Sequence, residues 1–205
     1  LLLTEAAWSQ PALRALALQA NRVLVLPQAL FKELSTLESP AAIGALIERP
    51  AASALRGDVP TLLLDRLQDA GNVGSILRSA AALGVPQVLA LKGTAALWSP
   101  KVLRAGMGAH FGLQLHEGLR LEDLDALCMP WVATSSHASM LLHRCTLPQP
   151  CVWVFGHEGQ GVAAELQARC ALTVRIAQPG GEESLNVAAA AAICLHEAVR
   201  QRDRQ

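Results

Sequence analysis

The 205-residue sequence predicts an α/β domain with a mainly parallel sheet and helices on both faces. Apolar strand candidates alternate with helical stretches along residues 61–205, which is typical of parallel sheets whose strands are joined by helices. The candidates are apolar at consecutive positions, as in strands that are covered on both faces. In chain order they are TLLLD, QVLAL, WVATS, CVWVF and LTVRIA.

The remaining elements follow from local patterns. Residues 1–50 mix a helical run, PALRALALQA, with the strand-like runs RVLVL and AIGALIE. The next stretch is rich in Pro, Gly and small residues, so residues 51–60 are interpreted as a linker and residues 61–205 as the main domain. Helices of the main domain are expected to begin near Gly74, Pro100, Leu119, Val162 and Asn186.

Composition limits the possible functions. A hydrophobic content of 52% supports a sizeable core, and a formal net charge of zero means that any nucleic-acid surface must be local. No apolar run approaches the roughly 20 residues that a membrane span needs. The N-terminus has no signal-peptide pattern, so we expect a cytoplasmic protein with no membrane association.

The cysteines indicate free thiols. There are five, an odd number, and none forms a CxxC pair, which favours a reducing compartment over a disulfide framework. His137, His143 and Cys145 lie close together in sequence, but their spacing matches no usual metal site. We therefore expect no bound metal.

Glycines and polar residues gather where three predicted strands end, the edge at which α/β sheets bind ligands. In FGHEGQG, residues 155–161, the glycines allow a ligand to approach the backbone, although a tight turn explains them equally well. Glu158 would repel a phosphate but suits ribose hydroxyls, an amino group or a cation. GMGAHFG, residues 106–112, is spaced like a dinucleotide fingerprint. It follows a predicted helix and not a strand, which excludes that function.

Arg78 lies in DAGNVGSILRSAAALG, residues 69–84, which predicts a largely apolar helix. Long helical side chains point toward the helix N-terminus, so its guanidinium should lean toward Asn72 and Gly74 at the strand end. Arg78 is then either a solvated surface charge or a group that grips a phosphate through two hydrogen bonds. The helical face around it carries small residues: Ser75, Ser79 and Ala82.

The loop IAQPGGEESLNV leads into an Ala-rich helix. Ser184 or Asn186 would cap this helix, which by itself explains either residue. The small side chains favour close helix packing, either in an ordinary core or against a second copy of the chain.

Three motifs in this order resemble the SpoU/TrmH-type RNA ribose methyltransferases of the SPOUT class. They are N-x-G-x-x-x-R at residues 72–78, F-G-x-E-x-x-G at 155–161 and S-L-N-V at 184–187. The resemblance covers about residues 58–205 and includes KVLRAGMGAHFGLQL. The third motif departs from the family, since Ile176-Ala177-Gln178 stands where I-P-M is usual. Residues 1–50 resemble the latter part of an L30e-like RNA-binding substrate domain, shortened at its start.

The resemblance implies a C-terminal trefoil knot, a homodimer, and methyl transfer from S-adenosylmethionine to a ribose 2′-hydroxyl of RNA, ribosomal RNA in preference to transfer RNA. It assigns the catalytic role to Arg78, positioning roles to Asn72 and Glu158, and site-shaping roles to Ser184 and Asn186. The cofactor-binding residues that it implies are Thr134, Gly156, Gly161, Ile176, Gln178 and Leu185.

The role of Arg78 and the activity itself each have an alternative. An arginine does not lose its proton in proteins. Arg78 therefore either grips a substrate phosphate that shares the proton or only orients the RNA. The alternative to an enzyme is a non-catalytic RNA-binding or ribosome-assembly protein on the same fold, favoured only by the altered I-P-M segment.

Overall fold

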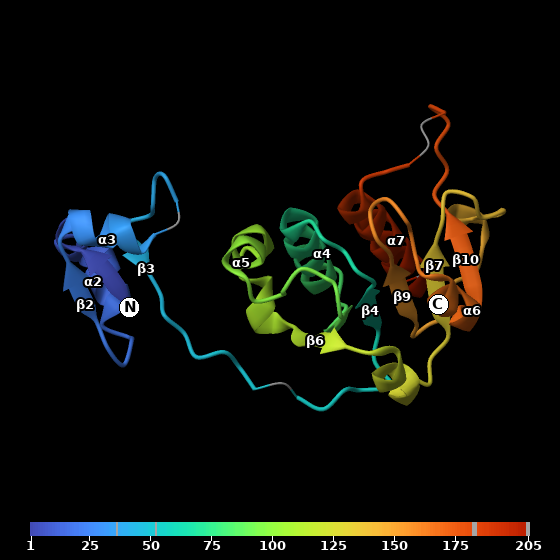
Figure 1. Ribbon diagram of the computed structural model, residues 1–205, viewed down its shortest axis with the longest axis horizontal. Helices are drawn as coiled ribbons and strands as arrows, with labels where there is room; N and C mark the ends of the chain where they lie inside the picture. Colours follow the sequence, from blue (N-terminus) through green and yellow to red (C-terminus); the bar gives the residue numbers. More distant parts are fainter. Residues whose placement is uncertain (36, 52, 182–183, 204–205) are drawn as a thin grey trace. The chain divides into compact units, whose positions relative to one another are not determined.

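The computed structural model describes residues 1–35, 37–51, 53–181 and 184–203. The chain divides into two compact units, Leu1–Ala51 and Ala52–Gln205 (Figure 1). No helix in the described residues is long and apolar enough to cross a membrane. The five cysteines are all free.

The first unit is a small mixed sheet with three helices. Strand β1 lies between β2, to which it is parallel, and β3, to which it is antiparallel. Its core contains Leu3, Ala7 and Ala17, which are fully buried. The elements are β1 (Leu2–Thr4), α1 (Glu5–Trp8), α2 (Pro11–Ala17), β2 (Leu24–Leu26), α3 (Gln28–Leu34) and β3 (Ile43–Gly44).

The second unit is built on a seven-stranded sheet in the order β6-β5-β4-β9-β7-β10-β8, and every neighbouring pair is parallel. The five predicted strands are β4 (Thr61–Leu64), β5 (Gln87–Leu91), β7 (Trp131–Thr134), β9 (Val152–Phe155) and β10 (Leu172–Arg175). Two further strands, β6 (Gln114–Leu119) and β8 (Met140–Leu141), form the sheet edges.

Helices cover both faces of this sheet, as predicted. Leu62 and Leu64 of β4 belong to one core cluster with residues of α4 and α7, whereas Leu63 belongs to a second cluster with residues of η2 and α6. This alternation follows from the period of two in a strand. The helices are α4 (Ala70–Ala82), α5 (Pro100–Gly106), α6 (Ala164–Arg169) and α7 (Val187–Arg202), with 3₁₀ turns η1 (Ala109–Gly112), η2 (Leu121–Ala126) and η3 (Leu142–Arg144).

Two details of the sequence-based prediction were wrong. Helix α4 begins at Ala70, not near Gly74, because Asp69 caps it by accepting a hydrogen bond from the Asn72 amide at 2.7 Å. The helix expected near Leu119 is only the 3₁₀ turn η2, and the residues before it form the strand β6, whose sequence QLHEGL lacks a continuous apolar run.

Gly74 lies inside α4, where the helix packs closely against α5. A Cβ at this position would lie 2.4 Å from the Ala105 Cβ and 2.7 Å from the Val102 carbonyl oxygen. No side chain fits there without a backbone shift. Gly74 therefore sets the spacing of the two helices (Figure 1).

Gly74→Ala is expected to lower the free energy of unfolding by about 1–3 kcal/mol, because overpacking outweighs the helix propensity gained. Gly112→Ala is the matched control, since nothing lies within 4 Å of its Cβ position. Urea unfolding of both variants measures the difference. Equal stabilities would contradict the assigned packing role.

Candidate active site

The carboxyl ends of β4, β9, β7 and β10 lie side by side at one edge of the sheet. Three of the predicted cofactor residues meet at this edge: Thr134 ends β7, Gly156 follows β9, and Ile176 follows β10. Of the predicted catalytic residues, Asn72 lies in the first turn of α4, Glu158 in the loop after β9 and Asn186 at the start of α7, and these three are in contact.

One chain of hydrogen bonds joins the three sequence motifs. The Asn72 side-chain amide donates to Oε1 of Glu158 at 3.3 Å. The Asn186 side-chain amide in turn donates to Oδ1 of Asn72 at 2.9 Å. The bonds therefore hold three segments together: the first turn of α4 with Asn72, the loop after β9 with Glu158 and the start of α7 with Asn186.

Hydrogen bonds from backbone amides extend this series of side-chain hydrogen bonds at both ends. Glu158 accepts hydrogen bonds from the amides of Gln68 at 3.3 Å and Asp69 at 3.1 Å. Asn186 Oδ1 accepts from the amides of Ala188 at 2.9 Å and Ala189 at 3.2 Å, which caps α7. Asn186 is therefore both a helix cap and a link between motifs. Ser184 is exposed on the same loop.

The Glu158 carboxylate is stabilised in its charged form. Partial burial alone would raise the pKa of this group, but hydrogen bonds from backbone amides and from Asn72 outweigh burial and lower the pKa below its ordinary value. Glu158 therefore carries a full negative charge at neutral pH and acts as an acceptor, not as a proton donor.

Arg78 lies on the exposed face of α4, while Ile76 and Ala80 on the other face are fully buried. Among the described residues, nothing forms a hydrogen bond or ion pair with its guanidinium. The lean of Arg78 toward Asn72 stays a prediction, because no described contact joins the two side chains. An exposed guanidinium on the helix that carries Asn72 is available to a bound anion.

Gly156 and Gly161 shape the loop that carries Glu158. A Cβ on Gly156 would lie 2.2 Å from the Gly161 carbonyl carbon and from the Val162 amide nitrogen. The Gly161 amide donates to the His157 carbonyl at 2.8 Å, and Gly161 has a φ of +68°. The tight turn considered from the sequence is therefore correct, and it presents Glu158 to Asn72.

Sequence reasoning missed a clamp formed by Asp65 and Arg66 at the end of β4. The buried Asp65 carboxylate accepts two hydrogen bonds from Arg66, at 2.8 and 3.1 Å, and one from the Ala163 amide at 2.8 Å. Arg66 Nη1 donates to the Gln160 side chain at 3.2 Å. The clamp ties the part of the loop that follows Glu158 to the end of β4. Its only signal in the sequence is an aspartate directly after a buried strand.

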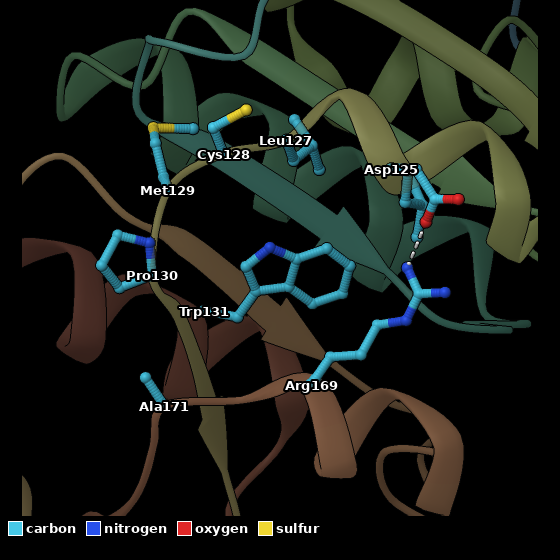
Figure 2. Close-up of a pocket in the computed structure, with 9 residues that line it drawn as sticks. Asp125, Leu127, Cys128, Met129, Pro130, Trp131, Arg169 and Ala171 are labelled. Carbon is cyan, nitrogen blue, oxygen red and sulfur yellow. Dashed lines mark hydrogen bonds and ion pairs between the residues drawn. The ribbon is translucent and has the colours of Figure 1, made fainter.

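A cavity of about 540 Å³ lies at the opposite edge of the sheet (Figure 2). Trp131 opens β7 and Ala171 precedes β10, so the cavity is at the amino ends of the strands. The two charged side chains that line it, Arg169 and Asp125, form an ion pair at 2.9 Å. The Arg169 guanidinium also lies 5.8 Å from the Trp131 ring centroid. This cavity is not part of the candidate site.

The sheet edge formed by the carboxyl ends of β4, β9, β7 and β10, which we call the active edge, suits a ligand with hydrogen-bond donors and positive charge. Oε1 of Gln178 is buried without a hydrogen-bond partner, so it has a free acceptor position on the β10–α7 loop. Glu158 contributes a negative charge at the same edge of the sheet. No group of three His, Cys, Asp or Glu side chains in the described residues is arranged to hold a metal ion. These residues fit S-adenosylmethionine, which carries donors and a sulfonium but no phosphate.

Comparisons with known proteins identify the family of this chain. Residues 60–196 match the model of the SpoU rRNA Methylase family. An uncharacterized tRNA/rRNA methyltransferase of Synechocystis is 34% identical over 92% of this chain and 70% of its own length. The 23S rRNA (uridine(2479)-2′-O)-methyltransferase of Streptomyces viridochromogenes is 29% identical over 95% of this chain and 72% of its own.

Solved structures support the same assignment. The SpoU methyltransferase AviRb from Streptomyces viridochromogenes, in complex with AdoMet, superposes with a TM-score of 0.85 and 28% identity, over 100% of this chain and 83% of that one. With the family model matching two thirds of the residues and the three motifs joined in one network, the chain belongs to the SpoU family of S-adenosylmethionine-dependent RNA 2′-O-ribose methyltransferases.

Proposed function

We propose that this chain methylates a ribose 2′-hydroxyl of ribosomal RNA, in preference to transfer RNA. The observation that carries the proposal is the hydrogen-bonded chain Glu158–Asn72–Asn186, together with an exposed Arg78 on the helix that carries Asn72. The preference for ribosomal RNA is supported by the name of the Streptomyces relative and by the L30e-like pattern of residues 1–50. We assign residues 1–50 to RNA binding, residues 51–60 to a linker and residues 61–205 to catalysis.

The residues of the active edge have different roles in the proposed reaction. When bound, S-adenosylmethionine supplies a methyl group on a positively charged sulfur, so the reaction needs no metal. We assign cofactor binding to Thr134, Gly156, Gly161, Ile176, Gln178 and Leu185. Ser184 borders the ribose, and Asn72 is held by Glu158 and Asn186 so that its position does not change as RNA binds.

Arg78 acts on the RNA. Its guanidinium grips a phosphate of the substrate in two-pronged fashion and lines up the neighbouring ribose for transfer. Since arginine keeps its own proton, the proton of the 2′-hydroxyl passes to an oxygen of that phosphate or to water. Arg78 is therefore an orienting and electrostatic group in this mechanism.

We also propose a C-terminal trefoil knot, a homodimer and a cytoplasmic location. The knot is supported by the sheet order, in which β9 lies between β4 and the earlier strand β7. The dimer is supported by an apolar cavity of about 610 Å³ along α7, lined in part by Ile193, which is 42% exposed.

The proposed function is tested by tritium transfer from labelled S-adenosylmethionine to separated ribosomal and transfer RNA, taken from a strain that lacks the gene. We expect label in ribosomal RNA. Label in transfer RNA alone would overturn the preference. The absence of label in both, with cofactor still bound, would favour a non-catalytic RNA-binding protein.

Arg78→Ala is expected to lower the transfer rate by about 10²–10³-fold, the usual effect of losing one positioned donor. Arg78→Lys should recover only part of it, because lysine cannot form the two-pronged contact. Calorimetry should find unchanged affinity for S-adenosylmethionine. Arg120→Ala, at an exposed arginine of another element, is the control. A cofactor affinity lost together with the rate would assign Arg78 to the cofactor pocket instead.

Glu158 should stabilise the fold in its ionised form. Its pKa is lowered in the folded state, so the contribution is full above the ordinary value of 4.5 and is lost as the pH falls through the lower folded value. Urea unfolding of wild type and Glu158→Gln should differ most above pH 4.5 and converge as the pH falls through the lowered folded pKa of Glu158. A difference that grows on acidification would contradict the network.

Gln178→Leu is expected to weaken binding of S-adenosylmethionine about tenfold, because a buried acceptor that receives a hydrogen bond from the cofactor is lost. Gln114→Leu is the matched control: its Oε1 is also buried without a partner, but it lies at the amino end of β6. Calorimetry measures both affinities. Equal affinities would remove Gln178 from the cofactor site.

A further inference from the structure

Two large apolar side chains are exposed to solvent just after α5, one at its C-cap and one in the turn η1. Met107 is 72% exposed and Phe111 is 66% exposed, the highest values for large hydrophobic residues in the described part of the second unit. This is the segment GMGAHFG, whose spacing mimics a dinucleotide fingerprint. The reaction proposed above gives it no role. A single exposed apolar residue needs no explanation, but two from one short turn do.

The turn is rigidly anchored and holds these side chains outward. His110, between them in sequence, is 1% exposed; its Nε2 bonds the Leu97 carbonyl at 2.8 Å and its ring contacts Trp98 at a centroid distance of 5.2 Å. A Cβ on Gly106 would lie 2.6 Å from the His110 ring, so glycine is needed there. Met107 has a φ of +48°, a conformation that methionine rarely adopts.

The surrounding sequence has an unusual charge distribution. Residues 70–116 contain no Asp or Glu, although the whole chain has equal numbers of acidic and basic residues. The same stretch contains four cations: Arg78, Lys92, Lys101 and Arg104. None of the four forms an ion pair with another residue of the described ranges.

Two of these cations lie next to the turn. Lys101 and Arg104 are exposed on α5, the helix that leads directly into it. Because α5 packs against α4 at Gly74, they belong to the same helical layer as Arg78 (Figure 1). We call Lys101, Arg104, Met107 and Phe111 the α5 surface.

We propose that the α5 surface binds single-stranded RNA next to the target nucleotide, with a base stacked on Phe111 and phosphates held by Lys101 and Arg104. This rests on the proposed function. An aromatic face beside cations is how proteins hold unpaired bases and their backbone. Because residues 70–116 contain no carboxylate side chain that would repel phosphates, this stretch suits a polyanionic ligand such as RNA. It also disfavours a second copy of this surface, since like charges would then face each other.

The test measures binding of a fluorescein-labelled oligouridylate of about 20 nucleotides to the full chain by anisotropy. Phe111→Ala should weaken binding about tenfold at any salt concentration, and Phe111→Trp should retain it, because tryptophan also stacks. Lys101→Ala/Arg104→Ala should weaken binding and reduce the slope of log affinity against log salt by about 1–2. Met140→Ala and Arg120→Ala are controls at an exposed methionine and an exposed arginine elsewhere.

Two results would overturn the proposal. One is an RNA affinity of Phe111→Ala equal to wild type in a folded protein that binds S-adenosylmethionine normally. The other is dissociation of an oligomer by Phe111→Ala in sedimentation, which would assign the surface to a second copy of the chain. Failure of the proposed function is separate: wild type would then bind the oligonucleotide through this surface yet transfer no methyl group to any RNA.

Discussion

The active edge depends on the hydrogen bonds that link Glu158, Asn72 and Asn186. These residues lie 86 and 114 positions apart in sequence, yet they meet because their loops follow strands of one parallel sheet. Each bond alone is worth about 1 kcal/mol. Together they bring Arg78's helix, the Glu158 loop and the start of α7 into one fixed arrangement, which is what orientation-dependent catalysis requires.

Close backbone contacts make this arrangement possible. Gly156 lets the Glu158 loop fold back on itself, and the Asp65–Arg66 clamp ties the loop to β4. Gly74 lets α4 lie against α5. Close packing thus accounts for the absence of a side chain at residues 74 and 156. The charged and amide side chains that they position are the ones to which we assign the chemistry.

Much of the fold could be predicted from local patterns. Runs of consecutive apolar residues predicted the five central strands, since strands buried on both faces need them. The edge strand β6 was missed because QLHEGL contains too few apolar residues, and the start of α4 was misplaced because Asp69 was not considered as its cap. The sequence assigned Asn72, Glu158 and Asn186 to one site, but it did not predict the bonds that join them. The pairings of Asp65 with Ala163 and of Asn72 with Asn186 depend on tertiary contacts that no sequence spacing contains.

The most direct test of the central claim asks which atom of the RNA receives the methyl group. Ribosomal RNA labelled by the purified chain and tritiated S-adenosylmethionine is hydrolysed in alkali, which cleaves only next to a free 2′-hydroxyl. Methyl transfer to the ribose predicts that the tritium is recovered in alkali-resistant dinucleotides. Tritium in mononucleotides would mean that a base is methylated, and it would contradict the account of this site.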